Sequence, residues 1–212
     1  ENISQLVLRP DTFAEPGYQL HKKALLSLKP GPQPGDPAFE HVYGLLEGPG
    51  RASGNGLNTL LDAYLLTGER GYLDQAEHII CCCVSPEDDL EAMDLLNAEL
   101  RWMYTVFLKA LARYIEVREA DDQPDGMHAY AKAAFIHYAL WMLDRERPYL
   151  DRPEILEFPN ETWAAQELRK SDVLALAGEM LAGQIRDRFM ERSFFFFSTG
   201  ISHLRQFENR TL

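Results

Sequence analysis

The chain has 212 residues, and its 33 acidic and 21 basic residues give a formal net charge of −12. This balance argues against binding to nucleic acid or to an anionic membrane surface, because both need clustered Lys and Arg, and no apolar run approaches the roughly 18–20 residues that span a bilayer. At roughly 100–200 residues per domain, residues 1–212 are expected to form a single domain.

Apolar residues recur every three or four positions in seven stretches, which predicts seven helices. The expected helices cover 17–29, 54–67, 71–84, 86–117, 127–144, 160–182 and 184–197. Clusters of Pro and Gly predict that residues 1–16 and 30–53 are irregular. Since no long alternating strand competes with these helices, the expected fold class is all-α.

The most informative block begins at Gly54 and predicts a pair of short helices. The first of that pair ends at Thr67-Gly68, where Gly68 suits a left-handed cap, and the second begins near Gly71. Because only about three residues separate the two helices, they are expected to fold back on each other as an antiparallel hairpin.

A long helix is predicted directly after this pair. Ser85 suits the N-cap, Pro86 the first helical position and Asp88 the capping-box position. No Gly or Pro interrupts the pattern before Val117, so the helix would be about 45 Å long, and we expect a bend or a break along it.

The stretch Gly56–Ala76 resembles a hairpin of the (α/α) toroid proteins, which include six-hairpin glycosidases, polysaccharide lyases and related sugar epimerases. The resemblance lies in an apolar helix, the turn Thr67-Gly68-Glu69, the pair Tyr72-Leu73 and the helix start Ala76-Glu77. It implies antiparallel helical hairpins and a carbohydrate ligand. A closed toroid needs more helices than this chain supplies, so we expect an incomplete α/α toroid or an open helical array.

Two groups of polar and aromatic residues fit a sugar site, where aromatic faces cover a pyranose ring and polar groups bind its hydroxyls. In the toroid families the pocket lies at the mouth of the inner helices and on the loops above them. The first cluster comprises His41, Tyr43, Arg51, Asn55, Asn58 and Asp62. The second cluster comprises Glu161, Trp163, Gln166, Arg169 and Lys170. Each cluster has an alternative reading, in which its residues cap helices, face solvent or anchor a helix to the core.

Within these clusters, the predicted catalytic residues depend on the reaction. Glycoside hydrolysis needs two carboxylates about 5–5.5 Å or about 6.5–9.5 Å apart, and Asp62 and Glu161 are the predicted pair. The remaining residues of both clusters, other than His41, are predicted to bind substrate.

Lyase-type elimination makes different demands on the same clusters. It needs a base, for which His41 or Tyr43 is predicted, and a cation such as Arg51 or Arg169 to neutralise a uronate carboxylate. The sequence leaves hydrolysis and elimination open.

A non-catalytic helical interaction module is the alternative function. The run Phe194–Phe197 would then be an exposed surface for a neighbouring domain or a second copy, whereas in the other reading its rings complete the core of the last helix. Because the chain begins at Glu1 rather than Met and ends soon after this run, we expect it to be a piece of a longer parent chain.

No cofactor or metal is predicted. The sequence has no P-loop, dinucleotide-binding Gly pattern, nucleophile elbow or His-Glu-x-x-His pair. The adjacent Cys81-Cys82-Cys83 fit neither a disulfide framework nor a zinc site and are expected to be buried, although His78 shares a helix face with Cys82.

Overall fold

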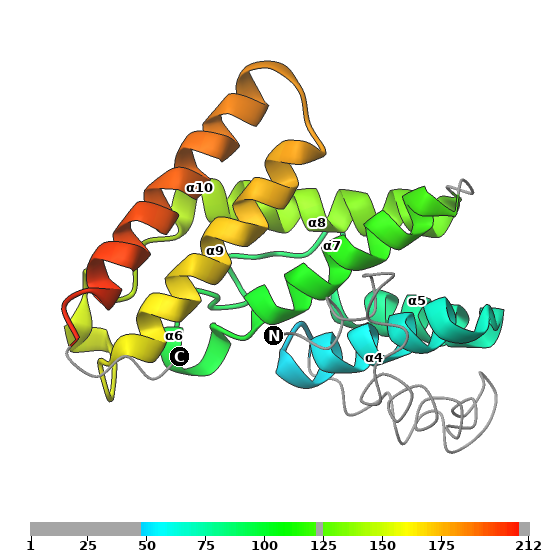
Figure 1. Cartoon of the computed structure of the whole chain (residues 1–212), viewed down its shortest axis with the longest axis horizontal. Coiled ribbons are helices and arrows are strands. Elements are labelled where there is room, and N and C mark those ends of the chain that lie inside the picture. The colour runs from blue at the N-terminus through cyan, green and yellow to red at the C-terminus, as the bar shows by residue number, and fades with distance from the viewer. Residues whose placement is uncertain (1–47, 122–124, 208–212) are drawn as a thin grey trace, which may run out of the picture.

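The computed structural model describes residues 48–121 and 125–207, which form α-helices joined by turns (Figure 1). The elements are α4 (Arg51–Thr67), α5 (Arg70–Cys83), α6 (Ala98–Arg101), α7 (Tyr104–Ala120), α8 (Gly126–Arg145), the 3-10 turn η2 (Pro153–Ile155), α9 (Glu161–Glu179) and α10 (Gly183–Leu204). No strand occurs in these two ranges, which confirms the all-α class. The helix predicted for 17–29 lies outside them. None of the described helices combines the length and hydropathy needed to cross a bilayer.

Helices α4 and α5 follow the sequence prediction closely. Gly68 has φ 71° and its N–H donates to the Tyr64 carbonyl at 2.8 Å, which ends α4 as a left-handed cap. Only Gly68 and Glu69 separate the two helices, and α5 packs against α4. Leu57 of α4 and Leu73 of α5 are completely buried.

The helix predicted for 86–117, with a bend or break along it, is wrong in its first part, because residues 84–97 contain turns but no helix and α7 begins only at Tyr104. The predicted cap does form locally: the Ser85 N–H donates to Asp88 Oδ2 at 2.7 Å. However, Tyr138 on α8 donates its hydroxyl to the same Asp88 oxygen at 2.7 Å, and His137 Nε2 lies 2.9 Å from the Asp88 carbonyl oxygen. These tertiary bonds occupy the carbonyl and side chain of Asp88, so the helix that the cap would start does not form.

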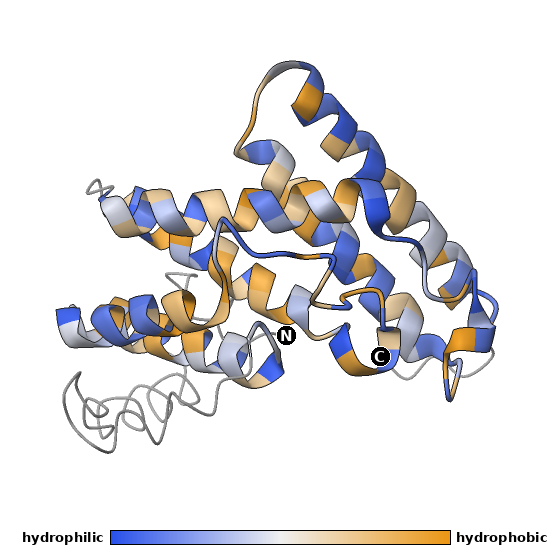
Figure 2. Cartoon of the chain, turned by 180° about the vertical axis from the view of Figure 1, so that it is seen from behind, coloured by the Kyte–Doolittle hydropathy of each residue, from blue (hydrophilic) through white to orange (hydrophobic). Residues whose placement is uncertain are grey.

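The helices bury one main core, and a smaller second cluster contains Ala98, Tyr149, Leu156 and Trp163. Helix α4 packs against α5 and α7, α7 also packs against α8 and α9, and α9 also packs against α8 and α10. Figure 2 shows hydrophobic and hydrophilic segments alternating along the helices, as expected when each has one buried face. Helices α4 and α7 lie very close together at Gly54, because a Cβ there would lie only 3.0 Å from the Phe107 Cα.

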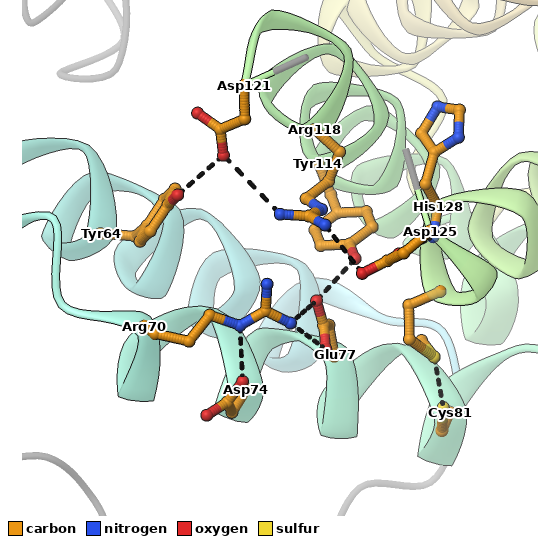
Figure 3. A network of polar contacts seen from close by, with 11 residues as sticks. Tyr64, Arg70, Asp74, Glu77, Cys81, Tyr114, Arg118, Asp121, Asp125 and His128 are labelled. Atoms are coloured by element: carbon orange, nitrogen blue, oxygen red, sulfur yellow. Dashed lines mark hydrogen bonds and ion pairs between the residues drawn. The ribbon is translucent and has the colours of Figure 1, made fainter. Parts of the chain in front are cut away.

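A polar network joins the ends of α4, α5, α7 and α8 (Figure 3). Arg118 is 2% exposed and pairs with Asp125 at 2.8 Å and with Asp121 at 3.7 Å. Asp121 also accepts the Tyr64 hydroxyl at 2.7 Å. The network therefore ties α4 to the α7–α8 connection through ionic and neutral hydrogen bonds.

The same network continues into α5 through Glu77. Its carboxylate accepts the Tyr114 hydroxyl at 3.0 Å and pairs with Arg70 at 2.8 Å (Figure 3). Burial raises the pKa of Glu77, and burial together with the Glu77 charge raises the pKa of Tyr114. Since these groups are already paired with one another, we assign the network to stability.

The last two helices differ from the prediction mainly at their ends. Asn160, the first residue of the helix expected over 160–182, caps α9 by accepting the Thr162 N–H at 3.0 Å. Helix α10 continues to Leu204, past the expected end at 197. Phe196 is buried but the other three rings of the Phe194–Phe197 run are exposed, so neither prediction for this run holds in full.

Candidate functional site

The first turn of α4 and the middle of α9 meet at Trp102, in the turn between α6 and α7. The Cζ atom of Arg51 lies 5.3 Å from the centroid of the Trp102 ring, and that of Arg169 lies 5.8 Å from it. Both distances allow a cation–π interaction. The structure thus brings together one arginine from each of the two clusters that the sequence indicates.

Trp102 also belongs to the wall of a cavity of about 230 Å³, which we call the Trp102 pocket. Its walls come from α6, the segment before α9 and the first turns of α9. The lining residues are Glu99, Trp102, Phe158, Asn160, Thr162, Trp163 and Gln166. Trp163 and Gln166 were predicted from the sequence to bind substrate, whereas Glu99 and Trp102 were not.

Local hydrogen bonds fix the α6 side of the pocket. Helix α6 is a single turn, capped by Asn97, whose side chain accepts the Leu100 N–H at 3.4 Å. The chain then turns at Trp102, whose carbonyl accepts the Thr105 hydroxyl at 2.9 Å. Glu99 accepts the Glu157 N–H at 2.7 Å and so joins this turn to the segment before α9.

Aromatic packing fixes the α9 side. The Trp163 indole N–H donates to the Phe158 carbonyl at 3.1 Å, and its ring lies 5.0 Å from that of Tyr149 between centroids. Trp163 is therefore a rigid part of the wall, with its polar edge satisfied by backbone.

One polar group in the wall lacks a partner. Gln166 is 7% exposed, and its side-chain oxygen Oε1 is buried without a hydrogen bond from any described residue. An unpartnered buried acceptor is costly. A hydroxyl donor that entered the pocket would give this amide a partner.

Two arginines lie at Trp102 beside the pocket, although the whole chain is acidic and Glu99 lies in the wall. Burial and the neighbouring charge of Arg51 lower the pKa of Arg169. The pocket also lies at the N-terminal end of α9, where the helix dipole favours negative charge. An anionic group bound beside Trp102 would relieve the repulsion between the two guanidinium groups.

Lys170, predicted to bind substrate, lies behind the pocket and not in it. Its side chain is completely buried, and Nζ contacts Glu146 Oε2 at 2.5 Å and the Arg147 carbonyl at 2.8 Å. Nζ also lies 3.3 Å from the centroid of the Tyr149 ring, and burial lowers the pKa of this amine. Through Tyr149, Lys170 supports Trp163.

Asp62 and Asn58 lie between α4 and α7 and do not line the pocket. Arg113 on α7 pairs with Asp62 Oδ1 at 2.5 Å and donates to Asn58 Oδ1 at 3.3 Å. Asp62 lies eleven residues beyond Arg51, which is about 16 Å along α4. Glu161, its predicted partner, adjoins the pocket wall between Asn160 and Thr162.

The other predicted residues do not join the pocket. Asn55 is exposed on the first turns of α4, and His41 and Tyr43 lie outside the described ranges. The described residues hold no group of three or more His, Cys, Asp or Glu side chains suited to a metal, although His78 Nε2 lies 3.3 Å from Cys82 Sγ. Cys81 and Cys82 are exposed and Cys83 alone is buried, so the prediction that all three are buried is wrong for two.

Comparisons of the chain with family models, with curated proteins and with solved structures gave no match. The chemistry of the Trp102 pocket is therefore the basis for assigning a function.

Proposed function

We propose that this chain is a carbohydrate-active or carbohydrate-binding domain, and that the Trp102 pocket holds one acidic sugar unit of an oligosaccharide. The observation that carries the proposal is the meeting of Arg51 and Arg169 over Trp102, beside a second indole in the wall. An indole face suits the apolar face of a pyranose, and guanidinium groups suit a carboxylate. Gln166 and Glu99 supply partners for hydroxyl groups.

The packing of the helices supports an incomplete (α/α) toroid or an open array. We interpret α4–α5, α7–α8 and α9–α10 as three antiparallel hairpins. The contacts of α4 with α7 and of α7 with α9 are those expected of an inner layer, and α5, α8 and α10 each contact the inner helix that precedes them. In this arrangement the Trp102 pocket occupies one end of the inner layer.

For a catalytic domain, we propose glycoside hydrolysis or lyase-type elimination as the reaction. Because Arg113 holds Asp62 away from the pocket, we propose Glu99 as the carboxylate that acts with Glu161 in hydrolysis. For elimination, His41 and Tyr43 remain the proposed bases.

The binding proposal is tested by titrating the chain with glucuronate or galacturonate oligosaccharides and with neutral glucose oligosaccharides, using tryptophan fluorescence and calorimetry. We expect the acidic ligands to bind more tightly. Trp102→Ala and Gln166→Leu should weaken binding at least about tenfold. Leu100→Ala, a change at a 67% exposed residue two positions from Trp102, should leave binding unchanged. Absence of binding to every oligosaccharide by the unmodified chain would reject the proposal.

A helical interaction module stays the second candidate, because three phenylalanine rings of α10 are exposed. A protein can have both an interaction surface and a sugar site, so this candidate replaces the first only if the titration fails.

A further inference from the structure

Helix α10 has two apolar faces, and the first is fully used by α9. Phe189, Phe196 and Gly200 are buried on this face. A Cβ at Gly200 would lie 3.1 Å from Leu168 Cδ2 and 3.3 Å from the Ala164 carbonyl oxygen, so the two helices are in close contact there. This face therefore gives α10 its buried contacts with the rest of the protein.

The second apolar face is exposed and adjoins the first. It consists of Met190, Phe194, Phe197 and Ile201, which we call the α10 stripe. These residues are spaced by four, three and four, so they form one continuous row on the helix. Met190 is 40% exposed, Phe194 is 70% exposed and Phe197 is 50% exposed. Aromatic side chains exposed in a row are typical of an interaction site.

We propose that the α10 stripe binds the same stripe of a second copy of this chain, with the two α10 helices antiparallel. A two-fold axis midway between positions 194 and 197 places Phe194 of one copy against Phe197 of the other. The same axis places Met190 against Ile201. The row is therefore complementary to itself, as a closed symmetric dimer requires.

The charges beside the stripe favour this antiparallel orientation. Asp187 and Arg205 are eighteen residues apart, or five helical turns, so they lie on one line along the outer border of the stripe. Glu191 lies near this border in the same half of α10 as Asp187. The antiparallel two-fold axis brings the acidic half of this border opposite Arg205 on the same border of the other copy, whereas in a parallel pair the two outer borders would not face each other.

The exposed area indicates a weak dimer. At about 150–250 Å² for a buried aromatic side chain, two phenylalanines that are half or more exposed have roughly 250 Å² to lose per copy. The two copies together would bury roughly 500 Å² from these rings, which is below the roughly 1,200 Å² of a stable specific interface. We therefore expect association that depends on protein concentration.

Sedimentation equilibrium from about 5 µM to about 500 µM is the direct test. The unmodified chain is expected to shift from monomer to dimer across this range, and Phe194→Ser should raise the dissociation constant at least about tenfold. Phe158→Ser is the matched control, because Phe158 is 69% exposed and lies before α9 in the Trp102 pocket. This control should dimerise like the unmodified chain.

Charge reversal tests the orientation. Asp187→Arg places arginine opposite Arg205 of the other copy and should weaken the dimer, and adding Arg205→Asp should restore it. Circular dichroism should show unchanged helix content, because both positions are exposed. A monomer at every concentration would overturn the proposal, and so would equal effects of Phe194→Ser and Phe158→Ser. A double reversal that fails to restore association would overturn the antiparallel arrangement. None of these outcomes depends on sugar binding.

Discussion

Arg51 and Arg169 stand over the same indole ring, with their Cζ atoms 5.3 and 5.8 Å from the centroid of Trp102. Two cations held at one aromatic ring repel each other, and this repulsion contributes to the lowered pKa of Arg169. A negatively charged ligand bound beside Trp102 would reduce this repulsion.

Glucuronate should accordingly raise the melting temperature of the unmodified chain, because a ligand that binds only the folded state stabilises it. In the double variant Arg51→Gln/Arg169→Gln this gain should disappear. The measurement is thermal unfolding followed by circular dichroism, with sodium chloride at equal ionic strength as the reference. An equal gain from sodium chloride, or a gain that survives in the double variant, would contradict the role given to the two arginines.

Lys170→Met should destabilise the fold by about 3–5 kcal/mol, because it leaves the buried Glu146 carboxylate without its cation. Urea unfolding measures the loss. The matched control is Lys132→Met, which removes a more exposed pair with Glu119 and should cost less than about 1 kcal/mol. If the two substitutions cost the same, Lys170 would not have the supporting role that its burial indicates.

Two glycines of α4 should respond in opposite ways to alanine. Gly54→Ala puts a Cβ 3.0 Å from backbone atoms of Phe107 and should cost about 1–3 kcal/mol. At Gly56 the nearest atom would be the flexible Ile79 Cδ1 at 3.6 Å, so Gly56→Ala should stabilise the helix by up to about 1 kcal/mol. Unfolding curves of both variants test the close packing of α4 on α7, and a stabilising Gly54→Ala would contradict it.

The pH dependence of stability should carry a contribution from Glu77. Its pKa is raised in the folded state, chiefly by burial, so the folded chain holds this proton more tightly than the unfolded chain does. The contribution is fully present below the ordinary pKa of 4.5 and is lost as the pH rises through the folded value.

Glu77→Gln isolates this contribution, because it removes the titrating group and keeps an acceptor for Tyr114. The free energy of unfolding should fall less steeply with rising pH above 4.5 in the variant than in the unmodified chain. Urea unfolding at a series of pH values gives both slopes. A variant slope equal to that of the unmodified chain would show that Glu77 titrates normally.

Local signals in the sequence were enough to predict the class and most helix limits. Gly68 ends α4 and Asn160 begins α9 because each effect involves only neighbouring residues. A bend or break within 86–117 was expected from the length of the helix, but its place between residues 84 and 97 could not be predicted in the same way. It depends on Asp88 bonding to Tyr138, fifty positions away, and no local pattern encodes that contact.

The candidate site was predicted in part, for the same reason. Trp163, Gln166, Arg51 and Arg169 were recognised in two separate clusters. Only the packing of the helices shows that the two arginines lie over Trp102, whose pocket is also lined by Trp163 and Gln166. Trp102 itself was overlooked because the apolar pattern placed it inside a long continuous helix. In the structure it lies at the interruption, where a side chain can face several helices at once.

Gly200 determines how near α10 can come to α9, because an added Cβ would lie only 3.1 Å from Leu168 Cδ2 and 3.3 Å from the Ala164 carbonyl oxygen. The Ala164 carbonyl that it faces belongs to the residue next to Trp163. A larger side chain at position 200 would push against the first turns of α9 and tilt the indole that they carry. A larger side chain at Gly200 should therefore disturb the Trp102 pocket as much as a substitution in the pocket wall does, although Gly200 does not line the pocket.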